Sequence, residues 1–268
     1  MTEVQKVTAS NDIKQTIQQV IQGFGGMSQF VSAGETVLIK PNYNTVDPFP
    51  ASTAPDFLKA VVEIVLEAGA KKVIVGDSST ISLTNHAKFV KNNFEKVGLY
   101  ELLKLGNQIE IMVFDEYEWI TKEIQQGKYL KAIKVPKVLD EVDKIIILPC
   151  AKTHKIAQFT GALKLIVGFM FPRDRIRFHM GKVQEKIAEM NTIYQPDLVI
   201  MDGRKCFISG GPTKGVVREP GLVLASKSRV AIDIEEVKII QSFEGNSLAG
   251  KIPTEITQIK YARELGIY

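Results

Sequence analysis

Lysine and histidine side chains cluster in one stretch of the chain, directly after an apolar run that is typical of a buried strand. Lys152 and His154 follow the run 142–148, and Lys164 comes shortly behind them. A lysine ammonium group supplies a point charge for a carboxylate or a phosphate. Imidazole titrates near neutral pH, so His154 with Lys152 or Asp77 could carry out general acid/base chemistry. The stretch predicts an anion site, and the alternative is that His154 is a hydrogen-bonded loop residue.

Polar residues also end three further runs that we predict to be parallel strands. The residues at these ends are Lys40 with Asn42, Asp77 with Ser78, and Asp202. Ligands of open α/β sheets bind in the crevice outside the carboxyl ends of the strands. We therefore assign catalytic roles to Lys152, His154, Asp77 and Asp202, and substrate-binding roles to Lys40, Asn42, Ser78, Lys164, Arg175 and His179. The alternative is that polar residues follow any buried strand, because loops lie at the surface.

The segment 172–179 is rich in arginine and follows a predicted buried helix over 160–171. The alternating Arg173, Arg175 and Arg177 could form a lid that closes on an anion, or the segment could be a solvated basic turn. The backbone amides at the start of the predicted helix, near Gly161, would favour an anionic group through the helix dipole. Both features indicate a negatively charged ligand.

No sequence motif identifies a cofactor. The candidate metal ligands are Asp77, Asp202, His154 and His179. No H-x-x-x-H, H-E-x-x-H or C-x-x-C spacing supports them, and we assign no metal ligand. The glycine-rich loop 209–215 lacks the G-x-x-x-x-G-K-[ST] order of a phosphate-binding loop, and no G-x-G-x-x-G follows a strand. The cofactor stays unknown.

The elements that position these residues alternate between strands and helices. This alternation predicts an α/β fold with a mostly parallel central sheet and helices on both faces. The strands are expected over 36–39, 71–77, 109–114, 142–148, 197–203 and 222–225. The helices are expected over 12–23, 53–67, 84–97, 160–171, 181–194, 230–243 and 254–265. Alternating apolar residues in 129–135 predict a small antiparallel hairpin insertion within 116–135, with its turn at 126–128.

Composition and charge limit the class of protein. The chain has 268 residues, 45% hydrophobic and 24% charged, which predicts a globular α/β domain over 1–268 with its last helix in 244–268. A formal net charge of +4 provides no polybasic face, so we expect no nucleic-acid partner. We see no signal peptide and no apolar stretch of membrane-spanning length, so we expect no membrane partner and a cytoplasmic protein.

The two cysteines, Cys150 and Cys206, are too few for a disulfide framework or for an iron–sulfur cluster. We expect two free thiols, with Cys150 as inert packing rather than a ligand. The predicted hairpin at 116–135 could pair subunits, so a homo-oligomer stays open.

Five sequence blocks occur in a fixed order: V-L-I-K-P-N, E-A-G-A-K-K-V-I-V-G-D-S, K-T-H with F-T-G-A-L-K, D-L-V-I-M-D-G with G-G-P, and A-S-K-S-R-V-A-I-D. Over about 35–240 this order resembles the uncharacterised family named domain of unknown function 362. The resemblance implies a shared site at Lys40, Asn42, Asp77, Ser78, Lys152, His154, Lys164, Asp202 and Asp233. Asp233 could equally be a capping carboxylate near a helix start.

Many members of that family carry an added ferredoxin-like C-x-x-C-x-x-C segment and are regarded as iron–sulfur proteins. This chain has only Cys150 and Cys206 and resembles the bare core, so cluster binding is not carried over. Three functions remain as hypotheses. The first is an enzyme or enzyme-like binder of a small anionic metabolite. The others are a non-catalytic accessory protein that works with an iron–sulfur or other redox partner, and a metal-dependent hydrolase or transferase.

Overall fold

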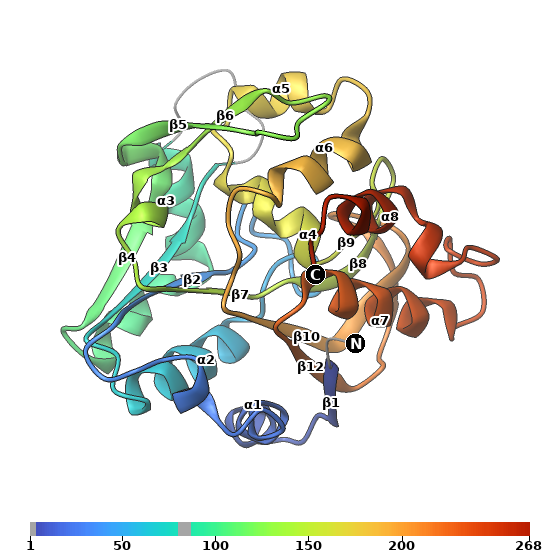
Figure 1. The fold of residues 1–268 in the computed structure, drawn as a ribbon. Coiled ribbons are helices and arrows are strands. Elements are labelled where there is room, and N and C mark those ends of the chain that lie inside the picture. The colour runs from blue at the N-terminus through green and yellow to red at the C-terminus, as the bar shows by residue number, and fades with distance from the viewer. Residues whose placement is uncertain (1–3, 80–86) are drawn as a thin grey trace.

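The computed structural model describes residues 4–79 and 87–268 and contains a large sheet flanked by helices (Figure 1). Its strands are β1 (Val4–Thr8), β2 (Thr36–Lys40), β3 (Lys72–Asp77), β4 (Ile109–Val113), β5 (Trp119–Glu123), β6 (Ala132–Pro136), β7 (Lys144–Ile147), β8 (Cys150–His154), β9 (Gln158–Thr160), β10 (Leu198–Gly210), β11 (Gly215–Arg218) and β12 (Leu222–Ser226). Its α-helices are α1 (Ile13–Gln22), α2 (Pro55–Glu67), α3 (Ala87–Lys96), α4 (Ala162–Leu165), α5 (Asp174–Phe178), α6 (Val183–Met190), α7 (Arg229–Gln241) and α8 (Thr257–Glu264). Short 3-10 helices are η1 (Met27–Gln29), η2 (Leu99–Leu105), η3 (Phe114–Glu116), η4 (Lys137–Asp140), η5 (Ile166–Phe169) and η6 (Pro253–Glu255).

The large sheet has the strand order β1-β12-β10-β7-β2-β3-β4. Its centre is parallel, because β10, β7, β2, β3 and β4 each run in the same direction as the next strand. Two antiparallel strands extend one edge, where β12 pairs with β10 and β1 pairs with β12. The protein is therefore an α/β protein with a mostly parallel central sheet, as the sequence predicts.

Both faces of the sheet are covered, which explains why its central strands are almost uniformly apolar. Alternate side chains of a strand point to opposite faces. In β2, Val37 and Ile39 belong to a core shared with α1, α2 and α3, whereas Leu38 belongs to a core shared with α4, α6, α7 and α8. Figure 1 shows α1 and α2 below the sheet and α4 and α6 above it. Helices on both faces were predicted, and this prediction is confirmed.

Strand β8 replaces a predicted loop. The chain resumes extended structure directly after Pro149, because β8 pairs in parallel with β10. Lys152 and His154 therefore lie on a strand. The same pairing, together with that of β11, carries β10 to Gly210. Asp202 consequently lies within a strand, and its predicted position at a strand end is wrong.

The predicted buried helix over 160–171 is broken into short elements. β9 extends to Thr160 because it pairs with β8, and α4 begins only at Ala162. The helix tightens into η5 at Ile166, and Met170 already has extended backbone. The segment is mostly buried, as predicted, but it contains no long helix. The following segment, predicted as a loop, contains the short helix α5.

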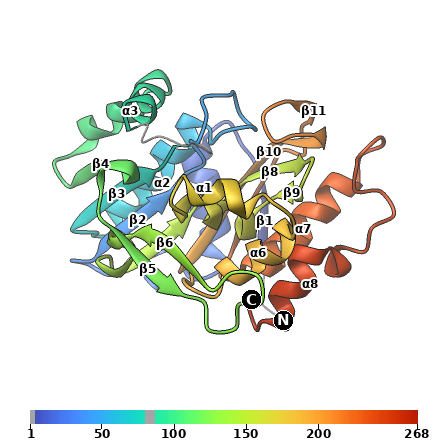
Figure 2. The same cartoon turned by 90° about the horizontal axis from the view of Figure 1, so that it is seen from above.

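β5 and β6 form the predicted antiparallel hairpin as a separate two-stranded sheet. Their connection spans 124–131 and is wider than the predicted turn at 126–128. The buried carboxylate of Glu189 explains this width, because it accepts hydrogen bonds from the backbone amides of Lys128, Tyr129 and Leu130. Seen from above in Figure 2, the hairpin lies on the side of the molecule opposite β11.

Several helix boundaries differ slightly from the prediction. Asp12 caps α1 through its side chain, so the helix begins one residue later than predicted. The predicted helix over 84–97 begins outside the described residues, and its described part is α3. Ser228 caps α7 through its side chain, so the helix begins earlier than predicted. Asp233 therefore lies in the second turn of α7 and is not its cap.

Candidate functional site

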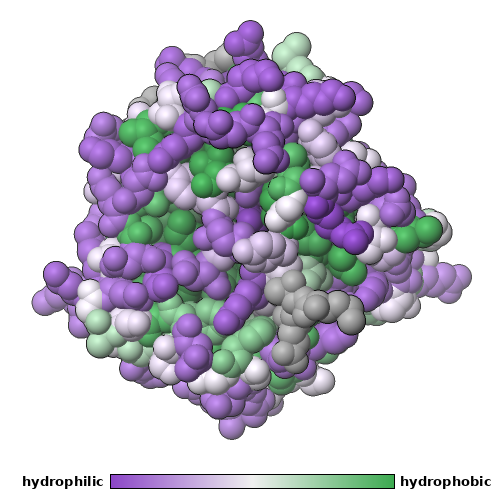
Figure 3. All heavy atoms as spheres, viewed as in Figure 1, coloured by the Kyte–Doolittle hydropathy of each residue, from purple (hydrophilic) through white to green (hydrophobic). Residues whose placement is uncertain are grey.

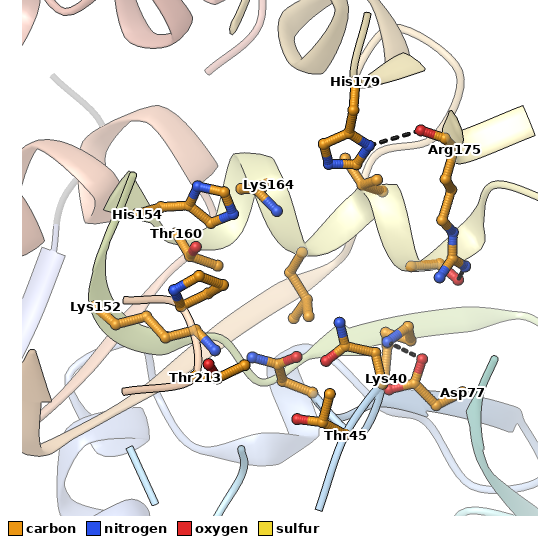
Figure 4. A pocket seen from close by; sticks show the side chains of 16 residues that line it. Lys40, Thr45, Asp77, Lys152, His154, Thr160, Lys164, Arg175, His179 and Thr213 are labelled. Atoms are coloured by element: carbon orange, nitrogen blue, oxygen red, sulfur yellow. Dashed lines mark hydrogen bonds and ion pairs between the residues drawn. The ribbon is translucent and has the colours of Figure 1, made fainter. Parts of the chain in front are cut away.

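A cavity of about 180 Å³ lies at the carboxyl ends of β2, β3 and β8. Helix α4, the segments η5 and α5, and the turn between β10 and β11 contribute further walls. It is lined by Lys40, Asn42, Asn44, Thr45, Asp77, Lys152, His154, Thr160, Lys164, Leu165, Val167, Gly168, Arg175, His179, Pro212 and Thr213 (Figure 4). Eight of the ten predicted site residues are in this set: Lys40, Asn42, Asp77, Lys152, His154, Lys164, Arg175 and His179.

Lys40 has internal partners at one end of the cavity. Its ammonium nitrogen lies 2.7 Å from Oδ1 of Asp77 and donates to the carbonyl oxygen of Pro41 at 2.7 Å. The Asp77 carboxylate also accepts hydrogen bonds from the amides of Tyr43 and Ser78. Burial lowers the pKa of Lys40, and the charge of Asp77 opposes this shift. The pair is satisfied without a ligand.

Arg175 likewise makes its hydrogen bonds to other groups of the protein. Its guanidinium group donates to the carbonyl oxygens of Met170 and Gly168 at 2.8 to 3.0 Å, and it also contacts Ser78 and Ser79. The side chain is 4% exposed, and burial lowers its pKa to about 10. Arg175 therefore anchors η5 to the end of β3. It is a buried residue and not part of a solvated turn.

Lys152 and Lys164 face the other end of the cavity. The ammonium group of Lys152 donates to the carbonyl oxygen of Ala51, and burial lowers its pKa. The ammonium group of Lys164 has no hydrogen-bond or ion-pair partner among the described residues. Burial, together with the charges of Lys152 and Arg175, lowers the pKa of Lys164 to about 7. Among the described residues, no carboxylate forms an ion pair with either ammonium group, although the charges of Asp47 and Glu236 act on Lys152.

His154 is held in one tautomer by its own loop. Its Nδ1 accepts hydrogen bonds from the backbone amides of Ile156 and Ala157, each at 3.1 Å. An accepting Nδ1 carries no proton, so the neutral ring carries its proton on Nε2. Burial and the nearby charge of Lys164 lower the pKa of His154 to about 3. The ring therefore offers an N–H donor, and it is not suited to accept a proton.

His179 has the opposite tautomer. Its Nδ1 lies 2.6 Å from the carbonyl oxygen of Arg175. A carbonyl oxygen only accepts hydrogen bonds, so Nδ1 must carry the proton. Burial lowers the pKa of His179, which leaves the ring neutral with a free electron pair on Nε2. His179 is thus the imidazole of this cavity that can accept a proton.

Hydroxyl and amide side chains that were not predicted complete the lining. They are Asn44, Thr45, Thr160 and Thr213. The sequence does contain one signal for Thr213, which is the pair of glycines just before it in the loop 209–215. A Cβ on Gly211 would lie 1.8 Å from the carbonyl oxygen of Thr153, so only glycine allows this turn to pack against β8. The double glycine therefore marks a turn that contacts the site strand.

Two predicted site residues lie outside the lining. Ser78 donates its hydroxyl hydrogen to the carbonyl oxygen of Gly168 at 2.9 Å. Asp202 is ion-paired at 2.7 Å with Arg204, which also reaches Asp56. Both side chains hold segments of the fold together. The geometry therefore does not bring Asp202 to the place where a ligand would react.

The amides at the start of α4 are not available to an anion either. The Asp233 carboxylate of α7 accepts hydrogen bonds from Ala162 at 2.6 Å and from Leu163 at 3.0 Å. The predicted anion site at these amides is therefore filled by a side chain of the protein itself. Asp233 thereby fixes the short helix that carries Lys164.

Cys150 is buried, and burial raises the pKa of its thiol to about 11, so it is not a thiolate at neutral pH. In the described ranges, no group of three or more His, Cys, Asp or Glu side chains is placed to hold a metal ion. Across the same ranges, every helix is too short or too polar to cross a bilayer.

The known proteins that resemble this chain include a thylakoid-associated protein and two solved structures. A thylakoid-associated protein of Synechocystis sp. is 28% identical over 234 residues, which are 84% of this chain and 69% of that protein. A crystal structure of a protein from Thermotoga maritima aligns with a TM-score of 0.44 and 12% identity, over 94% of this chain and 58% of that one. The lactate racemase apoprotein from Thermoanaerobacterium thermosaccharolyticum aligns with a TM-score of 0.45 and 10% identity, over 90% of this chain and 58% of that one. The chain thus spans little more than half the length of either solved structure.

The sequence profile of the family described as Domain of unknown function (DUF362) matches residues 37–237. The matched part contains every residue that lines the cavity, from Lys40 to Thr213. The order of sequence blocks predicts the same family. This chain therefore belongs to the DUF362 family.

Proposed function

We propose that the protein is an enzyme, or an enzyme-like binder, that takes a small anionic metabolite into the cavity. The observation that carries the proposal is the ammonium group of the partly buried Lys164, which has no partner among the described residues. The cations of the lining are Lys40, Lys152, Lys164 and Arg175, whereas its carboxylate is Asp77, which is already paired with Lys40. A buried charge is costly unless it is paired. An anionic ligand would supply the partner that Lys164 lacks.

The other groups of the cavity favour a small polar ligand. A volume of about 180 Å³ suits a small organic acid or phosphate better than a nucleotide. Lys152, Lys164 and the Nε2–H of His154 would receive the anionic group. The hydroxyl groups of Thr45 and Thr213 would contact the rest of the ligand.

Proton transfer is the chemistry that these side chains support best. The free Nε2 of His179 can accept a proton, and the pKa of Lys164 near 7 allows that group to give or take one at neutral pH. His154 would act as a hydrogen-bond donor to the ligand and not as a base. We propose that His179 and Lys164, instead of Asp202, exchange the proton.

Isothermal titration calorimetry with inorganic phosphate, acetate and small dicarboxylates tests this proposal. We expect at least one of these anions to bind the wild-type protein and the variant Lys155→Met, which removes an exposed lysine next to the site. We expect the double variant Lys152→Ala/His154→Ala to fold and to lose this binding. Equal binding by the double variant would refute the assignment. A protein that binds no anion but copurifies with a redox protein would favour the accessory role.

We also propose that the protein works in the cytoplasm. The proposal is supported by two buried cysteines, Cys150 and Cys206, that form no disulfide. The face shown in Figure 3 is largely polar, with scattered apolar residues, which suits contact with water. Fractionation of cells that express the tagged protein checks the location, and recovery only with membranes would contradict it.

A further inference from the structure

Two acidic side chains of α7, Asp233 and Glu236, are completely buried beside the strand and the helix that carry the cavity lysines. Both are 0% exposed, and their spacing of three residues places them on the same face of the helix. They meet at Gly161, where a Cβ would lie 2.3 Å from Oδ1 of Asp233 and 2.3 Å from Oε2 of Glu236. Two buried carboxylates this close do not both ionise, because like charges in a site of low polarity repel strongly.

Hydrogen bonds identify which carboxyl oxygen carries a proton. Both oxygens of Asp233 accept backbone amides, from Ala162 and Leu163. Oε1 of Glu236 accepts the amide of Lys152 at 2.9 Å. Oε2 of Glu236 is buried and has no partner in the part of the chain that the structure describes. It is the oxygen left to bear a proton, and Oδ1 of Asp233 is an acceptor on the same side of Gly161.

The surroundings of the pair favour one negative charge. The charged and titratable groups that face it are Lys152 on β8, Arg229 on α7 and Cys206 on β10. Burial raises the pKa of Asp233 to about 7, and it raises the pKa of Glu236 well above its ordinary value. The charge of Asp233 adds to the shift of Glu236. A neutral Glu236 beside an ionised Asp233 agrees with these directions.

We propose that Glu236 carries a proton and shares it with the Asp233 carboxylate, so that the two side chains form one singly charged pair that positions Lys152 and Lys164. Glu236 holds β8 through the backbone amide of Lys152. Asp233 holds the first amides of α4, the helix that carries Lys164. One rigid helix therefore sets the spacing between the two lysines. The positioning role rests on the proposed function, whereas the shared proton does not.

The shared proton is tested by infrared spectroscopy at a pH above the pKa of Asp233, about 7, so that a proton held by Asp233 alone gives no band. The wild-type protein and Glu244→Gln, which removes an exposed carboxylate, should both show the carbonyl stretch of a buried protonated carboxylic acid. The variant Glu236→Gln should lack it. Absence of the band in the wild-type protein, or its survival in Glu236→Gln, would overturn the shared proton. This readout needs no ligand, so it stands even if the proposed anion binding fails.

The positioning role is tested by following the Lys164 side chain by NMR during a pH titration. Glu236→Gln keeps an oxygen for the Lys152 amide and an N–H for Asp233, so Lys164 should titrate near 7, as in the wild-type protein. Glu236→Leu removes both hydrogen bonds, so the pKa of Lys164 should move toward 10.5. Affinity for inorganic phosphate should stay within about threefold in Glu236→Gln and fall about tenfold or more in Glu236→Leu. An unchanged Lys164 titration in a folded Glu236→Leu variant would refute positioning.

Discussion

Positively charged side chains lie at both ends of the cavity, but their partners differ between the two ends. At the end formed by β2 and β3, Lys40 is paired with Asp77, and the donors of Arg175 bind backbone carbonyl oxygens. At the end formed by β8 and α4, Lys152 reaches a carbonyl oxygen, and Lys164 has no partner that the described residues provide. In Figure 4 the two groups of side chains lie on opposite sides of the same space.

Under the proposed function, this difference separates cations that stabilise the fold from cations that would bind the ligand. A buried cation with an internal partner stabilises the fold, and removing either member of the pair leaves an unpaired charge. A partly buried cation without a partner, such as Lys164, loses hydration without compensation and gains most when an anion binds. Substitutions at the first end should therefore change stability, and substitutions at the second end should change binding.

The largest expected effect is on the stability of the protein, after a substitution at the end of the cavity formed by β2 and β3. Lys40→Met leaves the Asp77 carboxylate buried without a cation, so the free energy of unfolding should fall by about 3–5 kcal/mol. Urea denaturation measures this loss. The double variant Lys40→Met/Asp77→Asn should recover part of it, because the unpaired charge is then gone. A loss below about 1 kcal/mol in Lys40→Met would show that the pair is no more important than a surface ion pair.

The next effect is on binding at the second end. Lys164→Met removes the unpaired ammonium group and should weaken anion binding about 10- to 100-fold, as expected for a hydrogen bond between charged groups. Its stability at neutral pH should equal or exceed that of the wild-type protein, because no internal partner is lost. Calorimetry measures the anion affinity of this variant, and denaturation measures its stability. If Lys164→Met were destabilised but bound anions normally, Lys164 would stabilise the fold and would not be a binding residue.

The pH dependence should have opposite signs for binding and for stability. Lys164 is charged below its pKa of about 7, so anion affinity should fall up to tenfold per pH unit as the pH rises above this value. The folded pKa lies below the ordinary value of 10.5, so between about 7 and 10.5 the unfolded chain binds more protons. The contribution of Lys164 to stability should therefore improve as pH rises through this window. Subtracting the pH profile of Lys164→Met isolates this contribution from those of the other lysines.

The smallest expected effect concerns the charge of the two histidines. The pKa of His154 is lowered to about 3, and that of His179 is also lowered, so both rings should stay neutral at pH 7. Nitrogen-15 NMR should show the proton on Nε2 of His154 and on Nδ1 of His179. Addition of a bound anion should leave the His154 tautomer unchanged. Equal tautomers in the two rings would remove the reason to assign the proton-accepting role to His179.

Local patterns in the sequence were sufficient for most of the fold. The apolar runs at 36–39 and 71–77 became β2 and β3, because their side chains meet helices on both faces of the sheet. The same patterns placed Lys40 and Asp77 at the carboxyl ends of these strands. Errors occurred where distant pairing overrides local pattern. β8 and the long β10 exist because they pair with each other, and no neighbour in sequence reveals that pairing.

Local spacing was enough to predict eight residues that line the cavity, because strand ends and residue types follow from it. It could not predict which of these groups are free, because that depends on packing between remote segments. Lys40 and Lys164 look alike in sequence, but Asp77 reaches the first, and no described carboxylate reaches the second. In the same way, Asp233 fills the amides ahead of Lys164 from a helix far along the chain. The physical reason is that ion pairs and hydrogen bonds form only over short distances, and those distances are set by how remote segments pack.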